Sequence, residues 1–113
     1  MISRETAEHY TWGDRCDGWH LLRRPDLSII HERMPPGTAE VRHYHVKSRQ
    51  FFFVLAGVLT MEIEGRREVL AAQQALEIAP GAPHQARNES AGAVEFLVVS
   101  MPPSHGDRVG APV

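Results

Sequence analysis

Two histidines separated by one residue give this sequence its clearest chemical signal. His43 and His45 lie in the stretch GTAEVRHYHVKSRQFFFVLAG, residues 37–57, which runs into an apolar segment and stops at a glycine. Successive side chains of a β-strand alternate between its two faces, so in a strand both imidazoles point the same way. Two imidazoles that converge on one point can bind a metal ion. A pair of surface histidines on a polar strand is the alternative interpretation.

The segments that must position these histidines have the pattern of an all-β domain. In residues 58–64, apolar side chains alternate with Thr60, Glu62 and Glu64, which predicts a half-buried antiparallel strand. No segment of ten or more residues shows a 3.6-residue period. Strands are expected at residues 18–22, 27–34, 41–45, 50–56, 58–64, 68–71, 75–79, 84–88 and 93–101. Short strands at such regular spacing indicate one small barrel or sandwich.

The length of 113 residues fits a single domain, and 42% apolar with 23% charged residues is an ordinary globular composition. We expect residues 1–17 to form an N-terminal arm or strand. Residues 18–101 are expected to form the barrel. Residues 102–113 are rich in proline and glycine, and they are expected to be a loosely packed tail.

Several classes of function receive no support from the composition. A formal net charge of −2 and a pI near 6.4 argue against nucleic-acid binding. Cys16 is the only cysteine, so the chain has no internal disulfide. Residues 1–10 lack the apolar core of a signal peptide, and the apolar run at residues 51–59 is too short to cross a membrane. A cytoplasmic protein without a membrane partner is therefore expected.

Two motifs of this sequence resemble those of the cupin superfamily. They consist of Gly37, His43, His45, Gln50 and Gly57, followed by Gly81, His84 and Asn88. In that family the position of Gln50 usually holds a glutamate. Gln73-Gln74 stand where a glycine commonly opens the second motif, and Ala79 stands where a proline often lies. These changes affect turns and remove no ligand, and the resemblance covers residues 37–88.

The resemblance implies an all-β fold with a single cupin-type antiparallel β-barrel, a double-stranded β-helix or jelly roll. It also implies metal-ligand roles for His43, His45, Gln50 and His84 around one divalent transition metal ion (Fe, Ni, Mn, Zn or Cu). Three imidazoles and an amide oxygen leave one or two coordination positions open, as a catalytic metal needs. A neutral amide should weaken metal binding, and its NH₂ group can instead donate a hydrogen bond to a ligand. Coordination by Gln50 therefore stays open.

Further residues are candidates for the walls and the chemistry of the cavity. Phe52 and Val54 share a strand face with the glutamine, so with Met61 they are expected to form an apolar pocket wall. Glu32 shares a face with Met34 and points into the barrel if that methionine does. There it would be the candidate catalytic general base. On the opposite face it would be a salt-bridging surface glutamate.

The opposite face of the same strand carries Phe51, Phe53 and Leu55, and an apolar face of that kind needs a cover. Either the N-terminal strands or a partner subunit would serve. Small cupins are often dimers, so the resemblance favours a homodimer.

The cupin fold supports many chemistries, so the reaction is not decided by it. We expect an enzyme that acts on a small oxygenated molecule at a mononuclear three-histidine metal centre, of the dioxygenase, isomerase or lyase type. A non-catalytic cupin that binds a small ligand for sensing or storage is the alternative. A barrel that keeps the fold without metal is a third.

Overall fold

The computed structural model describes residues 1–113, and all of its regular elements are β-strands. The strands are β1 (Glu8–Trp12), β2 (Cys16–Arg24), β3 (Leu27–Met34), β4 (His43–Tyr44), β5 (Arg49–Ala56), β6 (Leu59–Ile63), β7 (Arg66–Leu70), β8 (Ala75–Ile78), β9 (His84–Arg87), β10 (Val94–Met101) and β11 (Val109–Gly110). The predicted all-β class is confirmed. No helix long and apolar enough to cross a membrane is found.

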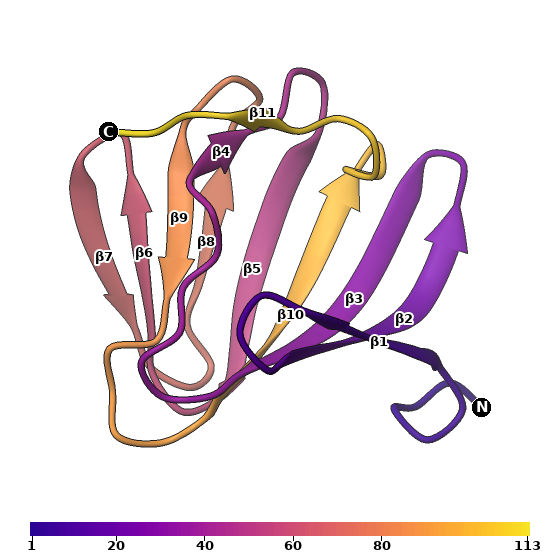
Figure 1. The fold of residues 1–113 in the computed structure, drawn as a ribbon. Helices are drawn as coiled ribbons and strands as arrows, with labels where there is room; N and C mark the ends of the chain where they lie inside the picture. The colour runs from indigo at the N-terminus through magenta and orange to yellow at the C-terminus, as the bar shows by residue number, and fades with distance from the viewer.

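The strands form two antiparallel sheets that face each other (Figure 1). The larger sheet has the order β1-β2-β3-β10-β5-β8, and the smaller has the order β11-β4-β9-β6-β7. Strands distant in sequence are neighbours in both sheets, because β10 lies between β3 and β5 while β9 lies between β4 and β6. This double-stranded β-helix brings segments from the whole chain around one interior.

Local turn chemistry closes the barrel at two places. Glu64 and Gly65 both have positive φ, at 51° and 86°, and they form the two-residue connection of the β6–β7 hairpin. Gly57 has φ of +83°, and a Cβ there would lie 2.4 Å from the carbonyl oxygen of Ala93. The last glycine of the first motif therefore lets the chain pass close to the start of β10.

The inner face of the larger sheet carries an apolar core and a polar row. Fourteen buried apolar residues form one cluster between the sheets. The register pairs Val98 with both Ile30 and Phe52, which gives an apolar row across β3, β10 and β5. Two residues further along, Ser100 pairs with both Ser28 and Gln50. Paired residues point to the same face, so Gln50 belongs to a polar row with Ser100 beside it and Ser28 on the next strand.

Both ends of the chain contain a short strand that pairs with another part of the molecule. β2 begins at Cys16, two residues before the strand that the sequence predicts, and β1 pairs along it from Glu8 to Trp12. The C-terminal segment, residues 102–113, was expected to pack loosely. Within it, β11 pairs with β4, and the Ala111 N–H donates to the Arg42 carbonyl at 3.0 Å. These long-range contacts leave no trace in a local sequence pattern.

Candidate metal centre and cavity

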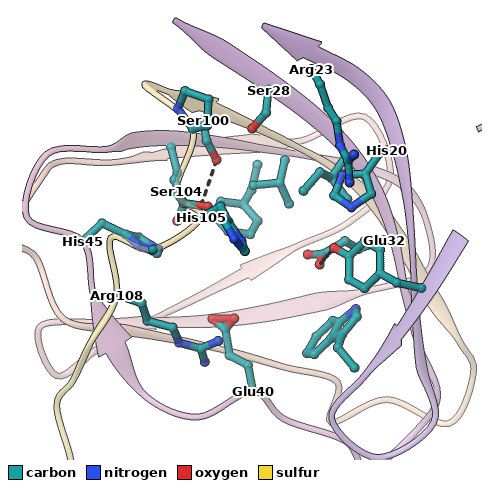
Figure 2. Close-up of a pocket in the computed structure, with 18 of the residues that line it drawn as sticks. His20, Arg23, Ser28, Glu32, Glu40, His45, Ser100, Ser104, His105 and Arg108 are labelled. Atoms are coloured by element: carbon teal, nitrogen blue, oxygen red, sulfur yellow. Dashed lines mark hydrogen bonds between the residues drawn. The ribbon is translucent and has the colours of Figure 1, made fainter. Parts of the chain in front are cut away.

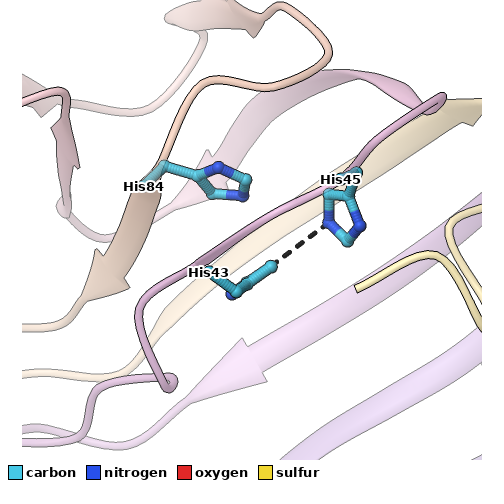
Figure 3. Close-up of side chains that lie close together, drawn as sticks. All are labelled: His43, His45 and His84. Atoms are coloured by element: carbon cyan, nitrogen blue, oxygen red, sulfur yellow. Dashed lines mark hydrogen bonds between the residues drawn. The ribbon is translucent and has the colours of Figure 1, made fainter. Parts of the chain in front are cut away.

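The three motif histidines meet at the inner face of the smaller sheet. His43 on β4 pairs directly with His84 at the start of β9, and His45 follows β4 by one residue. All three side chains are buried, and one ligand nitrogen from each lies within 4.8 Å of the other two. Figure 3 shows the rings converging from two adjacent segments. The structure thus brings together the three predicted histidine ligands.

Main-chain carbonyls orient each of the three rings. The Nδ1 of His43 donates to the Val41 carbonyl at 2.6 Å, and the Nδ1 of His84 donates to the Ala82 carbonyl at 2.9 Å. The Nδ1 of His45 donates to the Asp107 carbonyl. A carbonyl only accepts, so each Nδ1 carries the ring's hydrogen, and in the neutral ring Nε2 is left as a bare lone pair. This is the usual orientation of imidazoles that bind metal through Nε2.

The donor set fits a metal ion because the Nε2 atoms lack other partners. The Nε2 of His43 and the Nε2 of His45 are 3.2 Å apart, so two lone pairs face each other unless a proton or a cation lies between them. The Nε2 of His84 is buried without any partner. Burial, opposed by the bond to Val41 and aided by nearby His84, lowers the pKa of His43 to about 4. Protonation at neutral pH is therefore disfavoured, whereas a metal ion would satisfy all three nitrogens.

Gln50 lies in the same cavity as His43 and His45, with one end of its amide free. Its Nε2 donates to the Ser100 hydroxyl at 3.1 Å, and its Oε1 is buried without a partner. An unpaired buried amide oxygen is costly, so a metal ion, water or ligand is expected there. The arrangement supports coordination through Oε1, and the hydrogen bond to Ser100 assigns the NH₂ group to another role.

A cavity of about 770 Å³ opens beside the histidines (Figure 2). Most of its lining residues are polar. They include arginine and serine side chains from β2, β3, β10 and the segment after β10, namely Arg23, Arg24, Ser28, Ser100, Ser104 and Arg108. Of the three apolar residues assigned to its wall, Phe52 lines the cavity. Val54 and Met61 are fully buried in the closed core, which corrects the prediction of a three-residue apolar wall. Strand alternation predicts the correct face for Val54, but this residue lies one row of side chains deeper in the core than the cavity wall.

Glu32 points into the cavity, where the Tyr10 hydroxyl donates to its Oε2 at 3.3 Å. The side chain is half-buried, with its open side toward the cavity. Burial, followed by the nearby Glu40 carboxylate, raises the pKa of Glu32 to about 8. Of the two orientations left open for this residue, the inward one is therefore found, without an ion pair.

Sequence reasoning missed Glu40, which also lines the cavity. Its Oε1 accepts the Ala86 N–H at 3.1 Å and lies 3.9 Å from the Nδ1 of His43. Burial raises the pKa of Glu40 to about 7. Its position three residues before His43, inside the motif stretch, was the available signal.

The C-terminal segment contributes Arg108 and the anchor residue Asp107, neither of which the sequence singles out. The Asp107 carboxylate accepts the N–H groups of three consecutive residues, 46–48, at 2.8 to 2.9 Å. Those bonds, led by the one from Lys47, hold the pKa of Asp107 below its usual value. Asp107 thus fixes the loop after His45, while its own carbonyl orients the His45 ring.

Comparison with known proteins agrees with this architecture. The cupin domain family matches residues 30–100, so the chain belongs to the cupin family. KdgF from Halomonas sp. superposes with a TM-score of 0.85 at 16% identity, over 94% of this chain and 97% of that one. A predicted oxalate decarboxylase from Thermotoga maritima gives a TM-score of 0.83 at 17% identity, over 91% and 99%. The polyketide cyclase RemF from Streptomyces resistomycificus gives 0.84 at 16%, over 100% and 85%.

At these identities the structural neighbours establish the fold and no more. No functionally curated protein matches the sequence. The predicted cupin barrel is therefore confirmed, and the reaction has to be argued from the site.

Proposed function

We propose that this cupin binds one divalent transition metal ion (Fe, Ni, Mn, Zn or Cu) through His43, His45 and His84. The observation that carries the proposal concerns the nitrogens of the three rings. Each Nδ1 already donates to a main-chain carbonyl. Of the Nε2 atoms, two face each other and the third has no hydrogen-bond partner, so all three are available to a metal ion. When bound, the ion would act as a Lewis acid toward an oxygen of the ligand. Gln50 is the proposed fourth ligand through Oε1.

We further propose that the protein is an enzyme acting on a small oxygenated molecule of the size of the cavity. Guanidinium groups and hydroxyls in the lining favour a molecule with several oxygens, at least one of them anionic. Arg108 supports this because it pairs with no carboxylate and donates only to the Val41 carbonyl at 3.2 Å. Glu32 is the candidate catalytic acid–base group, which a site for binding alone does not need. An isomerase or lyase type of reaction uses such a group directly.

The metal site is tested by elemental analysis of protein purified without chelator. We expect close to one transition metal ion per chain in the wild type and a large loss in His43→Ala. His31→Ala is the matched control, because His31 is half-buried on the other side of the sheet and bonds to Glu95. Equal metal content in wild type and His43→Ala would refute the site.

Catalysis is tested separately, on metal-loaded protein. Oxygen uptake and product analysis with diketones, catechols, thiols and hydroxy acids should identify turnover that His43→Ala lacks. Tight retention of one of these compounds, with no product, would favour the alternative of a binding cupin.

We propose a homodimer through the outer face of β5. Phe51 is 39% exposed, and Met101, on the paired strand β10, is 41% exposed. The N-terminal strands do not cover this face, because β1 and β2 extend the same sheet beyond β3. Light scattering should give twice the monomer mass for the wild type and the monomer mass for Phe51→Glu. A monomeric wild type would contradict the proposal.

A further inference from the structure

A row of residues across four strands links the N-terminal strand to the cavity. Tyr10 of β1 pairs with Gly18 of β2, Gly18 pairs with Glu32 of β3, and Glu32 pairs with Phe96 of β10. Paired residues share a face of the sheet. Phe96 is fully buried in the core, so this row points inward. Tyr10 and Glu32 therefore lie on the cavity side, two strands apart, with a glycine between them.

The glycine between them provides the space that the tyrosine ring occupies. A Cβ built on Gly18 would lie 2.2 Å from the Cζ of Tyr10 and 2.5 Å from its hydroxyl oxygen. Any other residue at position 18 would therefore displace the ring. With glycine there, the ring crosses β2 against the backbone, beside His20 at 4.8 Å between centroids. Its hydroxyl then reaches the Oε2 of Glu32 at 3.3 Å.

We propose that Glu32 is the catalytic residue that exchanges a proton with the bound molecule, and that Tyr10, seated over Gly18, is its positioning residue. The proposal rests on the proposed function, because it needs a ligand in the cavity. The Tyr10 hydroxyl occupies Oε2, which leaves Oε1 for the ligand. The side-chain partner of Glu32 in the structure is the neutral Tyr10 hydroxyl and not a cation, so the carboxyl is free to change its charge during a reaction.

The proposed step moves one proton between the ligand and Glu32 and needs no other reactant. A C–H or O–H bond of the ligand breaks, its electron pair stays on the ligand, and an O–H bond forms on Oε1 of Glu32. In a second step Glu32 gives the proton to another atom of the same ligand, as an isomerisation requires. A carbonyl next to the C–H bond would accept the electron pair as an enolate.

The other charged and titratable groups around Glu32 set its protonation. Burial, followed by Glu40, raises the pKa of Glu32, whereas the bond from Tyr10 and the charge of Arg108 lower it. Cys16 on β2 is a further titratable neighbour, and its own pKa is raised, first by burial and also by Glu32. The net pKa of about 8 lies near neutrality, where a carboxyl can both take and give a proton.

The positioning role is tested on metal-free protein by ¹³C NMR titration of the glutamate side chains, with Glu32→Gln assigning the signal. We expect an elevated pKa for Glu32 in the wild type and a further rise in Tyr10→Phe, which keeps the ring and removes the hydrogen bond. Gly18→Ala should shift it in the same direction. Tyr44→Phe, a tyrosine outside the cavity lining, should leave it unchanged. An ordinary pKa for Glu32, or equal effects of Tyr10→Phe and Tyr44→Phe, would overturn the proposal.

Proton exchange is tested by the uptake of solvent deuterium into 2-oxobutanoate and dihydroxyacetone, followed by ¹H NMR with metal-loaded protein. We expect Glu32→Gln to slow exchange by about 10²-fold or more and Tyr10→Phe by about 10-fold. Metal content is measured in the same samples. Exchange by Glu32→Gln as fast as the wild type, or wild-type exchange no faster than buffer, overturns the role of Glu32. Undiminished metal in His43→Ala instead overturns the proposed metal site, so the two failures are distinguishable.

Discussion

Two members of the histidine group (His43, His45 and His84) line the same cavity as the Tyr10–Glu32 pair, and the third, His84, lies against His43. Different kinds of contact hold the group and the pair in place. Each histidine ring is fixed by a hydrogen bond to a main-chain carbonyl and is almost fully buried. Glu32 is fixed by one side-chain bond, from a tyrosine two strands away, and it is open to the cavity. The first arrangement depends on the backbone of the barrel, and the second depends on a single hydroxyl.

This difference suits the two kinds of chemistry that we propose. A metal ligand must keep its nitrogen at a fixed point, and a carbonyl partner gives that rigidity while fixing the tautomer. A group that exchanges protons must change its charge, and an ion-paired carboxylate would resist that change. The comparison therefore predicts that the two groups can be damaged separately.

Removing a histidine should have the largest effect. His84→Ala deletes one of three nitrogens and leaves the other two unable to enclose the ion, so metal affinity should fall by about 10²-fold or more. The elevated pKa of Glu32 in metal-free protein should persist, because His84 does not contribute to it. Metal titration and ¹³C NMR on the same variant measure both quantities. A collapse of both together would mean that the two groups are not independent.

Glu32→Gln should change stability in a way that depends on pH. The pKa of Glu32 is raised to about 8 in the folded state from about 4.5 when unfolded, so the folded state holds the proton more tightly. The stabilisation of the folded state by this proton is complete below pH 4.5 and is lost as pH rises through 8. Glutamine stays neutral at every pH. The free energy of unfolding of metal-free Glu32→Gln should therefore be about 2 kcal/mol higher than that of the wild type at pH 9, with the solvent in the cavity taken into account. Near pH 4.5 the two free energies should be equal.

Urea unfolding of both proteins at the two pH values gives this difference directly. A constant offset between the variant and the wild type at both values would contradict a buried neutral carboxyl. Glu64→Gln, in the exposed β6–β7 turn, is the control and should show no comparable change.

Asp107→Ala tests the outer support of the histidine group. The carboxylate fixes the N–H groups of residues 46–48, and the carbonyl of the same residue orients His45. Loss of the carboxylate should loosen this segment and lower metal affinity by about 10-fold, without removing any ligand. Calorimetric titration measures the change, and Asp26→Ala in the exposed β2–β3 turn is the control. Unchanged affinity would show that the backbone alone orients His45.

The same contrast explains what the sequence could predict of the site. His43, His45 and His84 were identifiable because they lie in two short motifs at fixed spacing, and strand alternation places Gln50 inward with them. Tyr10 carries no such signal. Its role depends on the register of β1 with β2 and on the space over Gly18, and only the folded sheet reveals either.

For the fold, the bounds of strands with strong alternation or apolar runs were predicted closely, such as those of β5 and β6. The predicted half-burial of β6 is wrong, because Thr60 and Glu62 are buried as well. The short strand β11 was not predicted, because its pairing depends on β4 and on the contacts of Asp107 rather than on the composition of the C-terminal segment. Local patterns thus predict strands that bury their own side chains. They fail for segments that are held by groups distant in sequence.

Gln50→Glu should have the smallest effect, and it decides whether Gln50 is a metal ligand together with the three histidines. If Oε1 coordinates, a carboxylate oxygen adds a negative charge to a neutral donor set, and metal affinity should rise several-fold. The Ser100 hydroxyl can turn to donate to the new carboxylate, so the local packing need not change. Gln74→Glu adds the same charge in an exposed turn, where its oxygen still accepts the Ala71 N–H, and it should leave affinity unchanged. Equal metal affinities for Gln50→Glu and the wild type would mean that Gln50 does not coordinate the metal and that, like Glu32, it acts on the small molecule in the cavity.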